Sequence, residues 1–158
     1  MTESGSAAPT ADEWELEAHP RKSAKYAIAV AVLLVVIHTT LGILLRTGNT
    51  GVFFQRADQV AMIAIGCGLA GGVLLLTRPR IKVGAQGVLV RNLVTEKLIP
   101  WDLVRGLSFS AGATWARVEL PDDEYVPVMA IQANDREYAV HAARTFRALE
   151  KKYATPVS

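Results

Sequence analysis

The sequence has few of the side chains from which most enzymes build a reactive site. Cys67 is the only cysteine, which excludes an internal disulfide and the cysteine spacing of a zinc site. The histidines are His19, His38 and His141, and no two of them have a metal-ligand spacing. The chain has no phosphate-binding Gly-Lys loop, no Gly-x-Ser-x-Gly elbow and no His-Glu-x-x-His pair. We therefore expect no catalytic residues, no metal site and no cofactor.

Charge is also sparse and nearly balanced in the second half of the chain. From Pro79 onward there are 11 basic and 9 acidic residues, a net charge of +2. No basic stripe with interleaved aromatic residues occurs there, so no nucleic-acid partner is expected. The densest carboxylate group is Asp122, Asp123 and Glu124. We interpret it as a solvated turn, with cation binding as the alternative.

Charged residues are absent from two long apolar runs, residues 26–45 and 59–77. A helix of about 20 apolar residues crosses the ~30 Å hydrocarbon core of a bilayer. We therefore predict a two-helix transmembrane hairpin over residues 23–78, with those runs as its spans. The alternatives are a cleaved signal peptide for the first run and a buried pair of soluble helices for both.

Basic residues near the predicted spans set the expected orientation. The connection between the spans carries fewer of them than the two outer flanks. This modest bias predicts a multi-pass cell-membrane protein with both termini and the C-terminal domain in the cytoplasm. The inverted orientation is the alternative. The outer flanks carry Arg21, Lys22 and Lys25 before the first span and Arg78, Arg80 and Lys82 after the second; the connection carries Arg46 and Arg56, with Phe53 and Phe54 expected at the far interface.

Small residues in the second span favour close helix packing. Gly68 and Gly72 form a Gly-x-x-x-Gly pair, and Gly66 with Ala70 forms a second pair of small residues. We expect the two spans to pack on each other, and a homodimer through the glycines is the sharper alternative. His38 lies inside the first span, where we favour a packing role over a place in a transport pathway.

The remaining segments predict a disordered tail, a strand-rich domain and a short C-terminal tail. Residues 1–22 are rich in small, polar and acidic side chains and are expected to be disordered. Residues 79–154 alternate between short β-rich runs and turns, which is typical of an antiparallel barrel or sandwich. The last part of this segment has a helical apolar face of Val140, Ala143, Phe146, Leu149 and Tyr153, which would cap the open end. Residues 155–158 form the tail. The expected strands are residues 80–84, 87–91, 93–99, 104–109, 115–120, 125–132 and 136–140.

Two motifs in this domain carry a resemblance to a known family. They are the glycine turn "GAQGVLVRN" and the step of Ile99, Pro100, Trp101 and Val104. Pro100 ends a strand and Trp101 supplies a large apolar plug; Leu103, Val104, Leu107 and Phe109 are then expected to re-enter the core. With the order of seven strands and one helix, these motifs resemble the bacterial pleckstrin-homology (PH) domain families. The resemblance is greatest to a small actinobacterial group with an N-terminal helix hairpin, one member of which is labelled a low-molecular-weight protein antigen.

The resemblance implies a membrane α plus β protein: a transmembrane hairpin followed by a PH-like seven-strand domain capped by a helix. We expect a non-catalytic interaction or assembly module with an unknown protein partner at the inner face of the membrane. The alternative is a reader of anionic lipid head groups. The candidate contacts for a partner or lipid are Arg80, Lys82, Arg91, Arg144, Arg147 and Lys151.

Overall fold

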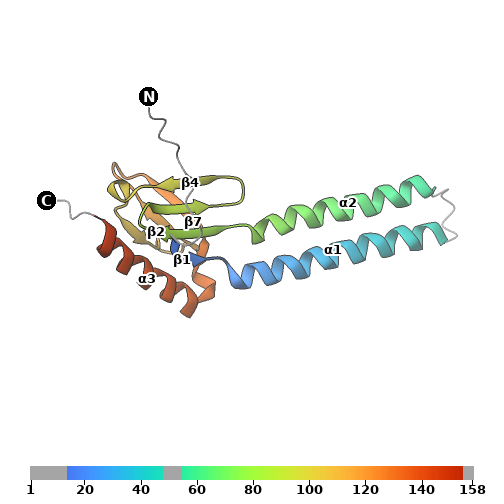
Figure 1. The fold of residues 1–158 in the computed structure, drawn as a ribbon. Helices are drawn as coiled ribbons and strands as arrows, with labels where there is room; N and C mark the ends of the chain where they lie inside the picture. The colour runs from blue at the N-terminus through green and yellow to red at the C-terminus, as the bar shows by residue number, and fades with distance from the viewer. Residues whose placement is uncertain (1–13, 48–54, 155–158) are drawn as a thin grey trace, which may run out of the picture. The chain divides into compact units, whose positions relative to one another are not determined.

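The computed structural model describes residues 14–47 and 55–154. Among them, the residues up to His19 and from Pro79 onward form one compact unit, and Pro20–Arg78 form the other (Figure 1). The chain therefore leaves the first unit after one short segment and returns to it later. Residues 1–13, most of the predicted outer loop with Phe53 and Phe54, and the predicted tail 155–158 lie outside the described residues.

The unit Pro20–Arg78 is a pair of helices, α1 (Arg21–Thr47) and α2 (Arg56–Leu74), with α2 followed by a 3-10 turn, η2 (Leu75–Thr77). The Asp58 carboxylate caps the start of α2 by accepting a hydrogen bond from the Gln55 backbone N–H at 2.9 Å. The two helices meet along a seam of small side chains that allows their backbones to approach closely. The buried residues of this seam are Ala27, Ala31 and Gly42 on α1 and Gly66 and Ala70 on α2.

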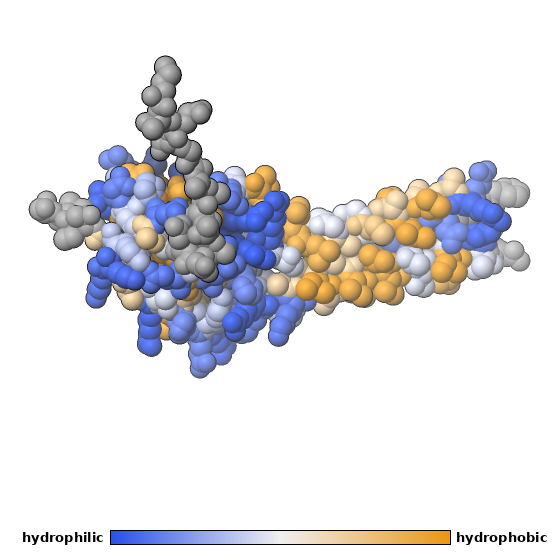
Figure 2. Space-filling model, in the orientation of Figure 1, coloured by the Kyte–Doolittle hydropathy of each residue, from blue (hydrophilic) through white to orange (hydrophobic). Residues whose placement is uncertain are grey.

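The apolar side chains of α1 and α2 are mostly exposed. Both helices are long and apolar enough to cross a membrane, and only 11% of the most apolar window of each is buried. The apolar surface over the two helices is visible in Figure 2. This surface is consistent with spans that face lipid rather than with helices in a soluble core.

The other unit begins with a strand that the sequence analysis did not predict. β1 (Trp14–Ala18) pairs antiparallel with β2 (Arg80–Gly84), and Ala18 lies opposite Ile81. Leu16 and Ala18 are buried while Glu15 and Glu17 face solvent, which is the two-residue period of a half-buried strand. The predicted disorder of residues 1–22 is therefore wrong from Trp14 onward.

β1 is one edge of a four-stranded antiparallel sheet in the order β1-β2-β3-β4. β3 (Gly87–Arg91) and β4 (Glu96–Ile99) follow β2, and β4 is shorter than the predicted run of residues 93–99 because a turn occupies its first positions. In that turn the Asn92 backbone N–H donates to the Thr95 carbonyl at 2.8 Å. Gly87 has φ of +130° and a Cβ there would collide with the Ile99 carbonyl, so this position requires glycine.

A second antiparallel sheet contains β5 (Gly106–Ser108), β6 (Trp115–Glu119) and β7 (Tyr125–Gln132), in that order. The strands of the described residues form two separate sheets and no closed barrel. The turn between β6 and β7 has Asp122 and Asp123 at φ values of 59° and 58°, a left-handed conformation that aspartate tolerates well. The predicted strand 136–140 is wrong, because a 3-10 turn, η4 (Ala133–Asp135), leads into a helix there.

That helix, α3 (Glu137–Tyr153), covers the core with most of the predicted face: Phe146 and Leu149 are buried, and Ala143 and Tyr153 pack against the core. Its buried residues are Ala139, Ala142, Phe146 and Leu149. Val140, which was expected on the core face, has an exposed fraction of 50%. The buried face therefore also includes Ala139 and Ala142, and of the five predicted residues only Val140 lies on the surface.

In the sequence, Pro100 and Trp101 lie between the last strand of the first sheet and the first strand of the second. In the folded domain they lie next to α3. Pro100 precedes a 3-10 turn, η3 (Trp101–Leu103), and Trp101 is buried. Its indole Nε1–H donates to the Gly84 carbonyl at 2.9 Å. The Trp101 ring centroid lies 6.0 Å from that of Phe146 and 6.2 Å from that of Tyr153, both on α3. Trp101 thus connects the first sheet to the covering helix.

The residues after this step divide between core and surface. Val104 and Leu107 are buried with exposed fractions of 5% and 6%. Leu103 and Phe109, which were also expected in the core, have exposed fractions of 44% and 41%. Phe109 follows the last residue of β5, and its side chain belongs to the site described next.

Candidate functional site

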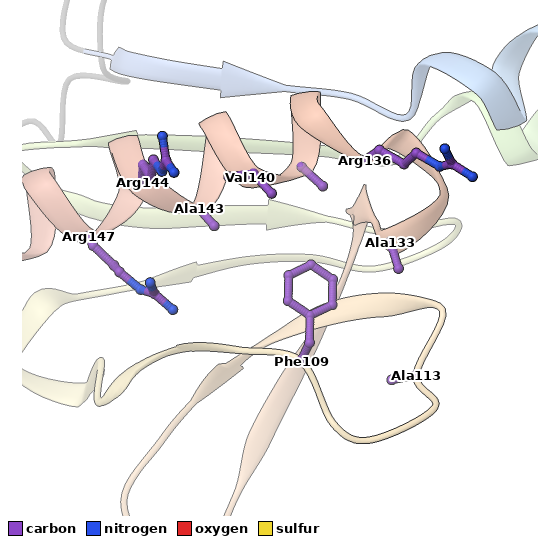
Figure 3. A pocket seen from close by; sticks show the side chains of 9 residues that line it. Phe109, Ala113, Ala133, Arg136, Val140, Ala143, Arg144 and Arg147 are labelled. Carbon is purple, nitrogen blue, oxygen red and sulfur yellow. The ribbon is translucent and has the colours of Figure 1, made fainter.

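An open groove of about 520 Å³ lies between α3 and the loop that follows β5. Its floor and walls are mostly apolar, and Phe109 projects toward α3 from the opposite wall (Figure 3). We call it the α3 groove. Its lining residues are Phe109, Ala113, Ala133, Arg136, Ala139, Val140, Ala143, Arg144 and Arg147.

Three arginines give the α3 groove its charge, and no carboxylate lines it. Arg136 precedes α3, while Arg144 and Arg147 lie on the exposed side of that helix. Within residues 14–47 and 55–154, none of the three forms an ion pair with a carboxylate within 4.0 Å. Among the described residues the groove therefore offers three guanidinium groups that are not held in an ion pair, with Glu150 as a more distant charge near Arg147.

The side of the groove that α3 provides is the part of the helix surface that carries the exposed Val140. Arg136, Val140, Ala143 and Arg147 are spaced three or four residues apart and so share one face. Lys151 lies one further turn along the same face and is exposed. An apolar stripe with basic residues along its length can contact a ligand that is both apolar and anionic.

Glu150 lies near the β5 side of α3, outside the groove lining. The position that a Cβ of Gly106 would occupy is 3.9 Å from the Glu150 Oε1 atom. Burial raises the pKa of the Glu150 carboxyl, and the nearby Arg147 charge opposes this shift. Arg147 is thus the groove arginine with a carboxylate in its electrostatic surroundings.

The other predicted contact residues do not reach this groove, because they lie on the first sheet and are paired. Arg80 and Lys82 both contact the Glu17 carboxylate, at 3.4 and 3.9 Å. Arg91 lies 3.2 Å from Glu96 on the neighbouring strand. Each of the three cations thus has a carboxylate beside it, which weakens them as a joint site for an anionic head group.

β1 is also fixed to α3 by a polar cluster. Lys152 donates to both Glu15 oxygens, at 3.0 and 2.9 Å, and the Tyr153 hydroxyl donates to the same carboxylate. These hydrogen bonds, that of Tyr153 first, lower the pKa of Glu15. The cluster makes the N-terminal strand part of the surface that carries α3.

The predicted motif residues lie in the core rather than in the groove. Ile99, Trp101 and Val104 are buried, while Pro100 is exposed. They connect the end of β4 to α3 and do not form a reactive site. Among the described residues, no group of three or more His, Cys, Asp or Glu side chains is arranged to hold a metal ion.

The predicted packing glycines of α2 face away from α1. A Cβ at Gly68 or Gly72 would meet no atom within 4 Å, whereas one at Gly66 would collide with the His38 side chain. The His38 Nδ1 atom is hydrogen-bonded to the Leu34 carbonyl of its own helix at 2.8 Å. His38 therefore packs against Gly66, and dimerisation through Gly68 and Gly72 stays a prediction.

Sequence reasoning found Arg144 and Arg147 but missed Arg136 and Phe109 as members of the site. Arg136 was placed in a strand, and Phe109 was placed in the core. One signal was available for Arg136: the "AND" turn before it indicates a break, after which a helix can begin. Phe109 had no such signal, because an alternating strand pattern does not show where the strand ends.

The chain is similar to one protein family and to several known proteins. Residues 78–149 match the family model described as a bacterial PH domain. An uncharacterized protein of Mycobacterium bovis is 49% identical over 142 residues, which cover 90% of this chain and 92% of that protein. Uncharacterized proteins of two Mycobacterium tuberculosis strains match to the same extent. No solved structure matches the chain.

Proposed function

The chain belongs to the bacterial PH domain family, and we propose that it is a non-catalytic membrane protein whose PH-like domain docks a protein partner at the inner face of the cell membrane. PH domains are typically non-catalytic. The observation that carries the docking role is the α3 groove, whose three arginines lie around an apolar floor and form no ion pair within residues 14–47 and 55–154. Such a surface suits binding and lacks the convergent reactive groups of an active site.

The exposed helices α1 and α2 support the membrane anchor. An apolar helix pair that is 11% buried would expose a large apolar surface to water, which is unfavourable outside a membrane. A cleaved signal peptide is disfavoured by β1, because cleavage after α1 would remove a strand that pairs with β2. The hairpin is therefore best interpreted as a permanent anchor.

The connectivity supports a single location for the whole PH-like domain. The hairpin starts after β1 and ends before β2, and these strands are neighbours in one sheet. Two crossings of the membrane return the chain to the side on which it started. The basic residues flanking both spans favour the cytoplasm as that side.

A protein partner fits the α3 groove better than a lipid head group fits the first sheet. Arg80 and Lys82 share the Glu17 carboxylate, and Arg91 is paired with Glu96. A head-group site needs several free donors that converge on one phosphate. The α3 groove instead combines three guanidinium groups, none of them ion-paired within the described part of the chain, with exposed apolar side chains, as the centre and rim of a protein interface do.

Photo-crosslinking in cells tests this function. A benzoylphenylalanine residue replaces Val140 in the full chain, and the control carries it at Leu103, which has a comparable exposed fraction of 44% against 50% for Val140. We expect a protein adduct of defined mass from position 140 and none from position 103. Adding Arg144→Gln and Arg147→Gln should reduce the adduct at position 140. The same adducts from both positions, or no adduct from position 140, would contradict the docking role.

A further inference from the structure

We propose that the segment docked in the α3 groove is acidic and carries one large apolar side chain, which enters the hollow beside Phe109 while its carboxylates pair with the groove arginines. This inference rests on the proposed docking function and names the chemistry of the partner. It follows from the charge of the groove, from the size of the side chains that line it and from the spread of its arginines.

The charge of the groove selects an acidic ligand. Arg136, Arg144 and Arg147 line it, and no acidic side chain does. A carboxylate that binds a guanidinium group forms a charge-assisted hydrogen bond, which is about twice as strong as a neutral one. A basic segment would place like charges beside unpaired arginines and would be rejected.

The size of the lining side chains leaves room for a large apolar group. Four alanines, which have no atom beyond Cβ, surround the space between Phe109 and Val140. Phe109 and Val140 keep exposed fractions of 41% and 50%, so neither is covered by the protein itself. Burying a phenylalanine-sized side chain there would strengthen binding by ~10- to 100-fold. The four alanines are Ala113, Ala133, Ala139 and Ala143.

The spread of the arginines favours a chain of carboxylates over a single phosphate. Arg136 immediately precedes α3, and the helix extends about 15 Å along its axis from Glu137 to Arg147 at the rise of an α-helix. Figure 3 shows the three guanidinium groups pointing in different directions rather than toward one point. A phosphate group is compact and is held best by donors that converge on it. Successive acidic residues of a protein segment can meet such separated groups one by one.

The test measures binding of a defined probe to the full chain in dodecyl maltoside micelles. The probe is a fluorescein-labelled heptapeptide with one central phenylalanine and six acidic residues, followed by fluorescence anisotropy. Two matched probes replace the phenylalanine by alanine or the acids by their amides. The protein variant is Arg144→Gln with Arg147→Gln, and its matched control is Arg80→Gln with Arg91→Gln, which removes the same charge from the paired residues of the first sheet.

We expect saturable binding of the phenylalanine probe, at least ~10-fold weaker binding of the alanine probe, and no measurable binding of the amide probe. Arg144→Gln with Arg147→Gln should weaken binding at least tenfold, as about one charge-assisted hydrogen bond would. The control variant should bind like the parent chain. Added salt should weaken binding, because the groove is open to solvent.

Several outcomes would overturn the inference. Equal binding of the acidic and amide probes, or unchanged binding by the Arg144→Gln and Arg147→Gln variant, would remove its basis. Arginine-dependent binding of dihexanoyl phosphatidylglycerol without binding of the probe would make the occupant a lipid. Binding that appears only after deletion of residues 2–12 would make it the chain's own acidic N-terminal stretch.

The crosslinking experiment separates this inference from the proposed function. If position 140 forms its adduct while the acidic probe fails to bind, the groove docks a partner of another chemistry and only the inference fails. If position 140 forms no adduct, the docking function itself fails, whatever the probe does.

Discussion

Ala18 at the end of β1 pairs with Ile81 in β2, although residues 20–78 lie between these two strands in the sequence. The helix hairpin is thus an insertion between neighbouring strands of one sheet. The PH-like domain of this chain includes residues before the hairpin, whereas the matched family segment starts at residue 78. This arrangement has direct consequences for stability.

Excision of the hairpin should leave a folded domain. Because Ala18 and Ile81 are paired, an Asn-Gly turn that replaces residues 19–80 closes a two-residue β-hairpin in the existing register. We expect a soluble protein that unfolds cooperatively in urea. A fragment of residues 79–158 lacks β1, leaves the edge of β2 unpaired and uncovers the core beneath Leu16. It should be less stable by at least ~2 kcal/mol, and equal stability of the two proteins would contradict the structural role of β1.

The Trp101 hydrogen bond should make a measurable contribution to stability. Trp101→Phe keeps an aromatic ring beside Phe146 but removes the donor to the buried Gly84 carbonyl. Leaving that carbonyl unsatisfied should cost about 1–3 kcal/mol. Trp115→Phe is the control, because Trp115 is 39% exposed and its replacement should change stability by less than ~0.5 kcal/mol. Urea denaturation of the two variants should therefore differ, and indistinguishable midpoints would be inconsistent with this account.

The sequence predicts those parts of the fold whose pattern is local. In β3, Val88 and Val90 are buried and alternate with less buried residues, and turns flank the strand. This local pattern predicts a strand. β1 shows a similar alternation, but the partner strand lies beyond the hairpin, and nothing nearby in the sequence indicates that Leu16 will be buried. An acidic, polar neighbourhood then favours disorder by composition alone.

The sequence predicts only part of the candidate site for a related reason. The apolar residues of α3 fit two faces, one through Val140 and Ala143 and one through Ala139 and Ala142, and both include Phe146 and Leu149 in their spacing. Which face is buried depends on the two sheets beneath the helix. The same tertiary contacts leave Val140 exposed and so form the groove with Phe109.

Close packing of α1 on α2 should depend on Gly66 and not on Gly68. The Cβ position of Gly42 lies 3.8 Å from the Met62 Cβ, within the usual range for a disulfide, so Gly42→Cys with Met62→Cys should form one on oxidation in a Cys67→Ser background. Gly66→Leu should suppress this cross-link by its collision with His38. Gly68→Leu should leave the yield of this cross-link unchanged. If a dimer forms through the exposed glycines, the same substitution should reduce the amount of dimer. Equal effects of both substitutions would contradict the observed helix face.

Attachment of β1 to α3 should weaken in acid. The hydrogen bonds from Tyr153 and Lys152 lower the pKa of Glu15, so the folded-state pKa lies below the unfolded-state value of about 4.3. The stabilisation is therefore complete above that value and is lost as the pH falls through the folded-state pKa. We expect the protection of β1 amides against hydrogen exchange, corrected for the intrinsic rate, to fall as the pH drops below the unfolded-state pKa of about 4.3.

Two variants give the comparison for this pH dependence. Glu15→Gln should show little change in β1 protection over the same range, because it has no carboxylate to protonate. Tyr153→Phe keeps the ring next to Trp101 and should show a weaker dependence than the parent chain. If Glu15→Gln keeps the full pH dependence, another group controls the attachment of β1.

The most direct test of the central claim, a PH-like domain anchored at the inner face of the membrane by its inserted hairpin, is thiol labelling in intact cells. Single cysteines at Asn49, between the two helices, and at Ser110, next to the α3 groove, are introduced in a Cys67→Ser background and exposed to a membrane-impermeant maleimide. The account predicts labelling at position 49 and none at position 110 until the cells are permeabilised. Labelling at position 110 but not at position 49, or equal labelling at both, would contradict it.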